Sequence, residues 1–276
     1  DPTPQAVARS VAAFCHSITE ATADIAVAVK PQIAFFERWG PPGLEALAEV
    51  VEFAAAKGLL VILDAKRGDI GSTAEAYAAA YLDPTGMGSH IHAITVNPYL
   101  GADSVEPFLR RAREHGKGVL LLVRTSNPSA AQVQDLSLGD GRPVYEAVAE
   151  LVRDWSAQAL APSGYSNVGA VVGATWPEQL RRVRSILSRH WFLLPGYGTQ
   201  GAGPLDVVTG LDDNGFGLLV NASRSIIYAW EQQRESDAVG QEYASAARTA
   251  AEEMRRAIAE AASRSAPSSS GGGAKA

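Results

Sequence analysis

The chain has 276 residues, of which 46% are hydrophobic and 20% charged, so it can bury a sizeable core and is not disordered throughout. Its 30 acidic and 24 basic residues give a formal net charge of -6, which argues against a broad binding surface for nucleic acid or anionic lipid. The single cysteine, Cys15, excludes an internal disulfide and a multi-thiolate metal site, and no apolar run reaches the length of about 18 residues typical of a membrane span. We therefore expect a cytoplasmic protein.

The elements predicted along the chain alternate between helices and strands. The first 24 residues predict a helix, which Thr3 can cap and Pro4 can begin. Amphipathic stretches at 44–57 and 177–189 predict further helices. Between the helical stretches lie seven runs rich in Val, Ile and Leu, at residues 25–31, 59–66, 91–98, 118–126, 168–175, 192–198 and 217–224. These runs are continuously apolar, which is typical of parallel strands covered on both faces.

This alternation predicts a (β/α)8 barrel. Successive runs start 32 residues apart on average, which is the size of one βα unit. Polar residues gather where the runs end, at the edge where both barrels and doubly wound sheets place their sites, and a phosphate site after the last two strands favours the barrel. Only seven strands are visible, and the chain begins with a helix. We expect the first strand to lie upstream of Asp1, the alternative being a barrel closed in an unusual way.

The domain organisation follows from the same pattern. We expect one catalytic barrel domain over residues 1–265, with an insertion loop at about 127–143 in the longest interval between strands. The Ser/Gly-rich tail over 266–276 is expected to be disordered.

The most informative segment is DAKRGDIGST, residues 64–73. Asp64 and Lys66 lie two positions apart on a strand, so their side chains share one side. Lys30 arrives from the neighbouring strand and Asp69 follows in the loop, so two lysines and two aspartates can form one charged cluster. Such a cluster could be a structural ion-pair network, but burying it at strand ends is costly unless it is used, which favours catalysis.

A second segment, PGYGTQGAG at residues 195–203, precedes Arg224, which follows the last strand. Glycines allow backbone N–H groups to approach an anion, and an arginine can bind two phosphate oxygens. Loop geometry alone could explain the glycines, but their combination with the arginine predicts a phosphate site.

His90 and His92 could in principle bind a metal. They precede their strand, at the end away from the expected active face, so we expect no metal site.

These motifs carry a family resemblance. DAKRGDIGST matches the pattern D-x-K-x-x-D-I-x-x-T of orotidine 5'-monophosphate decarboxylases. VKPQIAFFERWG, NPYLG, RTSNP, VVGAT, PGYGTQGAG and SRSI occur in the order of that family over about residues 10–230. The sequence resembles the longer bacterial branch of the family. The aspartate-lysine motif alone is shared with sugar-phosphate decarboxylases of the same suprafamily.

The resemblance implies a charged catalytic tetrad and a homodimer with shared active sites. The implied roles are Lys30, Asp64, Lys66 and Asp69 in the tetrad, Asp69, Ile70 and Thr73 reaching into the partner subunit's site, Ser126 at the pyrimidine, and Gln200 and Arg224 at the 5'-phosphate. The sequence departs from the family at two places. Ser223 stands where a glycine is usual, and the strand-one aspartate that touches the ribose has no secure counterpart.

The function implied is cofactor-independent decarboxylation of orotidine 5'-monophosphate to UMP in de novo pyrimidine biosynthesis, with Lys66 protonating an electrostatically stabilised carbanion. Two alternatives stay open at this point. A metal-dependent 3-keto-sugar-phosphate decarboxylase would need additional acidic or histidine ligands at strand ends. A non-catalytic nucleotide-binding barrel would have no reason to keep the whole tetrad.

Overall fold

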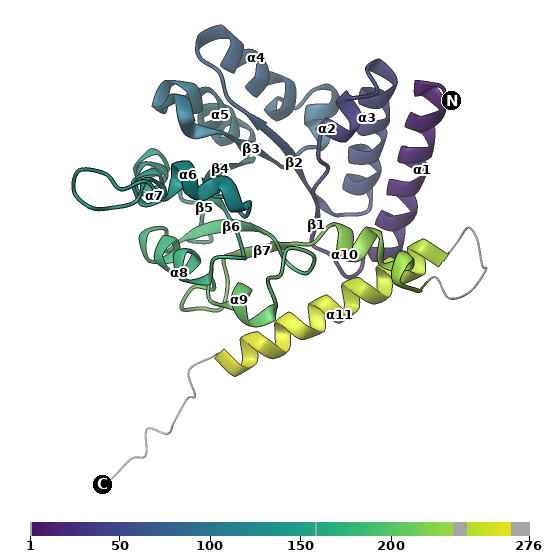
Figure 1. The fold of residues 1–276 in the computed structure, drawn as a ribbon. Coiled ribbons are helices and arrows are strands. Elements are labelled where there is room, and N and C mark those ends of the chain that lie inside the picture. Colours follow the sequence, from purple (N-terminus) through teal and green to yellow (C-terminus); the bar gives the residue numbers. More distant parts are fainter. Residues whose placement is uncertain (1, 158, 234–241, 266–276) are drawn as a thin grey trace.

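The computed structural model describes residues 2–157, 159–233 and 242–265, and the tail expected over 266–276 lies outside them. Seven strands form one parallel sheet in chain order, and the helices lie outside its curve (Figure 1). The strands are β1 (Ala28–Val29), β2 (Leu60–Arg67), β3 (Ala93–Val96), β4 (Gly118–Arg124), β5 (Ser166–Val172), β6 (His190–Pro195) and β7 (Leu218–Asn221). All seven predicted strands are therefore confirmed.

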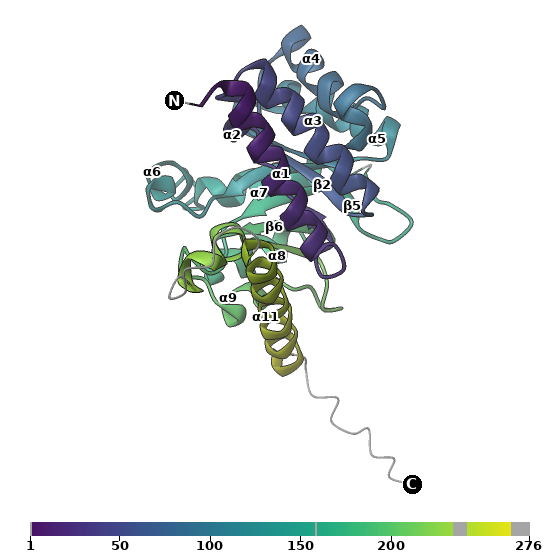
Figure 2. The ribbon, with the colours of Figure 1, turned by 90° about the vertical axis from the view of Figure 1, so that its right-hand side faces the viewer.

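In the described parts of the chain, one helix precedes β1, two α-helices follow β7, and the other helices connect successive strands. The helices are α1 (Pro4–Thr22), α2 (Ala34–Glu37), α3 (Pro41–Ala56), α4 (Gly71–Leu82), α5 (Ala102–His115), α6 (Ala131–Gln134), α7 (Val144–Trp155), α8 (Pro177–Ile186), α9 (Pro204–Val208), α10 (Arg224–Ile227) and α11 (Glu242–Ser265). The predicted cap of α1 is confirmed, because Thr3 Oγ1 accepts a hydrogen bond of 3.2 Å from the Ala6 N–H. Helices α1 and α11 pack together (Figure 2). Arg248 of α11 pairs with Asp24 just after α1.

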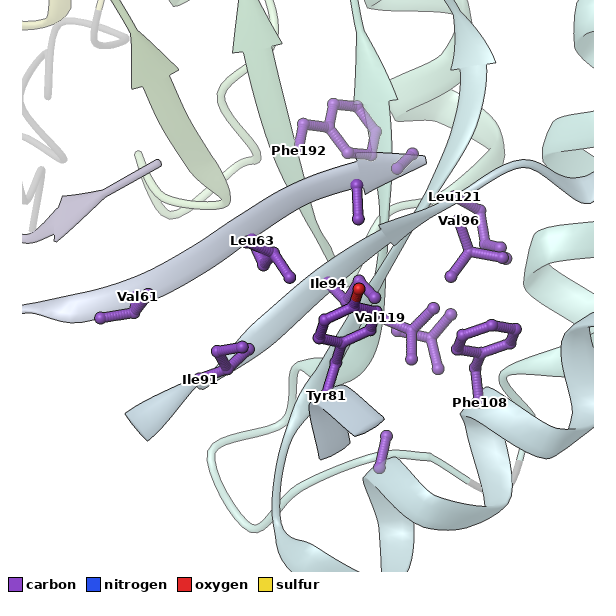
Figure 3. Packing of buried hydrophobic residues seen from close by; sticks show 14 of the residues in the cluster. Val61, Leu63, Tyr81, Ile91, Ile94, Val96, Phe108, Val119, Leu121 and Phe192 are labelled. Atoms are coloured by element: carbon purple, nitrogen blue, oxygen red, sulfur yellow. The ribbon is translucent and has the colours of Figure 1, made fainter. Parts of the chain in front are cut away.

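The two faces of the sheet bury different clusters, because successive strand residues point to opposite faces. The outer face packs against the helices, and Figure 3 shows Leu63, Val96 and Leu121 of this layer with Phe108 of α5. The inner face holds a separate apolar cluster, formed by Ile62, Leu120, Val171 and Leu193. Asp64 lies two residues after Ile62, so it belongs to the inner face and stands beyond this apolar cluster.

The sheet has a seam between β1 and β7. In the described parts of the chain, strand pairing runs from β1 to β7, and no pairing joins these two strands. An apolar cavity of about 240 Å³ lies at the seam, lined by both strands and by Ala251, Met254 and Ile258 of α11. One more parallel strand here would complete eight, which agrees with the prediction of a (β/α)8 barrel that lacks its first strand.

A buried histidine at the start of β6 makes stability depend on pH. His190 is 7% exposed, its Nε2 lies 2.8 Å from Ser156 Oγ, and burial together with the charge of Arg184 lowers its pKa from 6.5 to about 4. Below pH 6.5 the unfolded chain takes up this proton before the folded chain does, so stability is lost as the pH falls from 6.5 towards 4. By linkage the loss amounts to about 3 kcal/mol at pH 4 relative to pH 7.5.

We therefore expect His190→Gln to flatten the pH dependence of the free energy of unfolding, even if the variant is less stable at neutral pH. Urea unfolding of both proteins at several pH values between 4 and 7.5 measures this directly. Parallel curves for the two proteins would contradict a neutral, buried His190.

Candidate active site

Three of the predicted charged residues meet at the ends of β1 and β2. Lys30 Nζ lies 2.6 Å from Asp64 Oδ2, and Lys66 Nζ lies 2.5 Å from Asp64 Oδ1. The Asp64 and Lys30 side chains are only 9% and 12% exposed, whereas Lys66 is 43% exposed. One carboxylate thus holds two ammonium groups, and the Lys66 ammonium is the one that solvent or a ligand can reach.

The charge state of Asp64 follows from these contacts. Burial alone would raise the pKa of this carboxyl, but the charge of Lys30 and the hydrogen bonds from Lys30 and Lys66 outweigh burial and lower the pKa below its usual value. Asp64 is therefore ionised at neutral pH. The negative charge of Asp64 thus lies beside the solvent-accessible ammonium group of Lys66, at the end of the inner apolar cluster that contains Ile62.

The backbone at this point leaves regular strand geometry. The pairing of β2 with β3 shifts between Leu63 and Arg67, so that Asp64, Ala65 and Lys66 stand opposite Thr95 alone. Lys66 has a positive φ of +46°. All other described residues with a positive φ are glycines. Its N–H donates to Thr95 Oγ1 at 2.9 Å, and Thr95 Oγ1 donates to Asp64 Oδ1 at 3.0 Å.

Thr95 was missed by the sequence analysis. The sequence contains one indication of its role: Thr95 is the polar residue of the strand AITV, and alternation puts its side chain on the same face as that of Asn97 at the polar end of the strand. A lone threonine in a strand is common, however, because β-branched residues suit strands. The register shift that brings it to Asp64 and Lys66 is not visible in the sequence.

Asp69, Ile70 and Thr73 lie apart from this cluster. The Asp69 carboxylate accepts a hydrogen bond of 2.8 Å from the Ile70 N–H, and within the described parts of the chain it makes no ion pair with Lys30 or Lys66. Ile70 is 55% exposed, and Thr73 is exposed in the first turn of α4. The loop after β2 thus exposes the apolar Ile70 side chain and leaves the half-buried Asp69 without an ion pair to Lys30 or Lys66 of its own chain.

A second group of predicted residues surrounds Gly196, directly after β6. A methyl group at Gly196 would lie 3.2 Å from Thr175 Cγ2, 3.3 Å from Gln200 Oε1 and 3.5 Å from Ser126 Cβ. Gly196 also has φ +109°, a conformation that favours glycine. The structure therefore brings Ser126 and Gln200 together around the point where a side chain at position 196 would begin.

Arg224 lies beside this loop. It is the first residue of α10, it is exposed, and it forms no ion pair with any residue that the structure describes. A methyl group at Gly198 would lie 2.9 Å from Ser225 Oγ, so the glycine-rich loop packs against the start of α10. Ser223 has φ -112°, so serine in place of the family's usual glycine is not strained here.

The insertion at 127–143 is bound to the two residues that precede Ser126, Arg124 and Thr125. Arg124 ends β4 and is fully buried, with Nη2 3.0 Å from Asp135 Oδ2 and its guanidinium 4.8 Å from the centre of the Trp176 ring. Gln134 Oε1 accepts a hydrogen bond of 2.8 Å from the Thr125 N–H. The insertion, which contains the short helix α6, is thereby tied to the strand that carries Ser126.

No group of three or more His, Cys, Asp or Glu side chains within 2–157, 159–233 and 242–265 is placed to hold a metal ion. In the same part of the chain no helix combines the length and the apolar character needed to cross a bilayer.

Comparison with known proteins places the chain in a family. Residues 8–239 match the family model described as orotidine 5'-phosphate decarboxylase / HUMPS family. The chain belongs to this family. A relative from Rhodopirellula baltica named orotidine 5'-phosphate decarboxylase is 47% identical over 83% of this chain and 77% of its own length. Another of that name, from a Roseiflexus species, is 43% identical over 91% of this chain and 84% of its own length.

A solved structure agrees with this family assignment. The chain resembles the OMP decarboxylase of Leishmania donovani with a TM-score of 0.75 and 37% sequence identity, over 95% of this chain and 90% of that one. The resemblance stated from the motifs is therefore confirmed for both family and fold.

Proposed function

We propose that this protein of the orotidine 5'-phosphate decarboxylase / HUMPS family decarboxylates orotidine 5'-monophosphate to UMP, as a carbon-carbon lyase of pyrimidine biosynthesis. The observation that carries the proposal is the Lys30–Asp64–Lys66 cluster at the C-terminal ends of β1 and β2. The names of the relatives at 47% and 43% identity support the same substrate. The cytoplasmic location expected from the sequence stays a prediction.

The chemistry requires a fixed positive charge and a proton. When the bond between the ring carbon and the carboxyl group breaks, carbon dioxide leaves and the electron pair remains on an sp² carbon that has no ordinary electron sink. The Lys66 ammonium stabilises this charge and gives its proton to the carbon, which forms UMP, and Lys66 regains a proton from solvent. No electron acceptor or cofactor is needed to balance this step.

Asp64 and Lys30 support Lys66 in different ways. The ionised Asp64 carboxylate would stand near the substrate carboxylate, so it disfavours the bound ground state more than a transition state from which carbon dioxide is departing. Lys30 binds the other oxygen of Asp64 and thereby holds the carboxylate against both ammonium groups.

The remaining site residues recognise the ends of the nucleotide. In this proposal Ser126 binds the pyrimidine, and Gln200 and Arg224 bind the 5'-phosphate. Ser126 and Gln200 both lie next to Gly196, and Arg224 has no competing ion pair among the described residues, which supports these assignments. Binding energy from the phosphate would fix the ring over Lys66.

We further propose that the active unit is a homodimer in which Asp69, Ile70 and Thr73 complete the partner subunit's site. Asp69 makes no ion pair with Lys66 of its own chain, and Ile70 is 55% exposed on the same loop. An exposed apolar residue beside a carboxylate that makes no ion pair with any described residue is suited to a symmetric interface that builds two composite sites.

One assay tests the reaction against the two alternatives. Mixing the protein with orotidine 5'-monophosphate should remove the ultraviolet absorption of the orotate ring, and a chelator should leave the rate unchanged. A sugar-phosphate decarboxylase that needs a metal would not consume this nucleotide and would lose its own activity with chelator. A non-catalytic binding barrel would bind the nucleotide without any spectral loss.

Arg224→Ala should raise the KM for orotidine 5'-monophosphate by about 10- to 100-fold, the range expected for a charge-assisted hydrogen bond to phosphate. The slow turnover of orotidine, which lacks the phosphate, should barely change. Arg181→Ala, at an exposed position of α8, is the control and should affect neither substrate. Equal losses on both substrates would show that Arg224 does not act through the phosphate.

A further inference from the structure

Thr95 is almost completely buried, at 1% exposure, and its hydroxyl joins the two central residues of the charged cluster. A backbone N–H can only donate and a carboxylate can only accept, so the direction of both hydrogen bonds is determined. Thr95 Oγ1 accepts from the Lys66 N–H at 2.9 Å and donates its one hydrogen to Asp64 Oδ1 at 3.0 Å. The one hydrogen of this hydroxyl and one of its two lone pairs are thus used inside the charged cluster.

The backbone around Lys66 depends on this contact. Three residues of β2 stand opposite Thr95 alone, so the regular ladder of β2 and β3 does not supply an acceptor for each of their N–H groups. Lys66 also has φ +46°, a conformation that an L-residue adopts at an energetic cost. The hydroxyl of Thr95 provides the acceptor that a regular register would have provided as a carbonyl.

The orientation of the Asp64 carboxylate depends on it as well. Oδ1 accepts from Lys66 Nζ at 2.5 Å and from Thr95 Oγ1, while Oδ2 accepts from Lys30 Nζ at 2.6 Å. Lysine side chains are flexible and their donors rotate, whereas the Thr95 hydroxyl is held on a buried strand. Of the three donors, Thr95 is therefore the rigid one that determines the plane of the carboxylate.

We propose that Thr95 is a positioning residue of the decarboxylation: its hydroxyl holds the Lys66 backbone in the left-handed conformation and the Asp64 carboxylate in its plane, so that the Lys66 ammonium stays where the ring carbon is protonated. This inference rests on the proposed function. It assigns a role to a side chain that touches neither the phosphate nor the pyrimidine, so the loss of its hydroxyl should affect the chemical step and not nucleotide binding.

Thr95→Val tests this, because valine keeps the branched shape and removes only the hydroxyl. We expect kcat to fall by about 10- to 100-fold, the size of effect that a small misplacement of a reacting group produces. The KM and the Kd of UMP should stay within about 3-fold of wild type. Thr95→Ser, which restores the hydroxyl, should recover most of kcat.

Thr22→Val is the matched control. Thr22 is also a buried threonine, and its hydroxyl donates to the Ile18 carbonyl at 2.8 Å within α1, outside the charged cluster. It should lower thermal stability at most and leave kcat of the folded protein unchanged. A merely structural role for Thr95 would give the same pattern in Thr95→Val.

The inference is overturned if folded Thr95→Val keeps more than about a third of kcat, or if Thr95→Ser is as impaired as Thr95→Val. If Thr95→Val does not fold, Thr95→Ala takes its place in the comparison with Thr95→Ser. Failure of the proposed function is a separate result, because the wild-type protein would then leave orotidine 5'-monophosphate unchanged before any variant is compared.

Discussion

Lys66→Ala should abolish turnover of orotidine 5'-monophosphate while UMP still binds. The variant loses the proton donor and the positive charge nearest the developing carbanion, and general acid catalysis alone contributes about 100- to 10,000-fold. The phosphate contacts proposed for Gln200 and Arg224 stay intact. The spectroscopic assay measures turnover, and calorimetric titration measures UMP binding.

The control is Lys57→Ala. Lys57 follows α3 directly, pairs with Glu20 and is not part of the site. Retention by Lys66→Ala of more than about a tenth of the wild-type rate, equivalent to about 1.4 kcal/mol of barrier, would contradict the proton-donor role.

Chemical rescue sharpens this experiment. Lys66→Cys treated with 2-bromoethylamine carries an ammonium on a side chain of nearly lysine length, so activity should return. The chain's own Cys15 is packed against the core, and burial raises the pKa of its thiol to about 11, so it should react slowly. Wild-type protein treated in the same way is the control and should keep its rate. Treated Lys66→Cys that stays inactive would indicate that more than the ammonium was lost.

Mixing two inactive variants should restore activity if sites are shared between subunits. Homodimers of Lys66→Ala and of Asp69→Ala each lack one component in both sites. In a heterodimer, one site combines the intact Lys66 of one chain with the intact Asp69 of the other, and the second site carries both defects. Random exchange makes half of the dimers heterodimers, so the activity should approach about a quarter of wild type.

The controls for this experiment are each variant alone under the same exchange conditions and a mixture of Lys66→Ala with Asp64→Ala. Asp64 and Lys66 of one chain form a direct ion pair within one site, so in this heterodimer each site carries one of the two defects. That mixture should therefore stay inactive. Exchange is followed by mass spectrometry. Complete exchange without any return of activity in the first mixture would show that Asp69 serves its own subunit.

The architecture was largely accessible from the sequence. Continuous apolar runs at the spacing of βα units predict parallel strands covered on both faces, and all seven were found. Helix caps are local, so Thr3 and Pro4 predicted the start of α1 correctly. The seam between β1 and β7, with its cavity under α11, was expected only as a missing strand. Its lining depends on how α11 folds back, which no local pattern specifies.

The site, too, was predictable from the sequence in part only. Alternation along a strand determined that Asp64 and Lys66 share a side, and the order of strands in a parallel sheet brought Lys30 to them. The role of Thr95 was decided by a register shift of β2 against β3, and the burial of Arg124 by the insertion that covers it. Both depend on contacts between segments about 30 and 11 residues apart in the chain, which only the packed structure brings together. Sequence thus determined which side chains carry charge at the strand ends, while tertiary packing decided which neutral groups hold them in place.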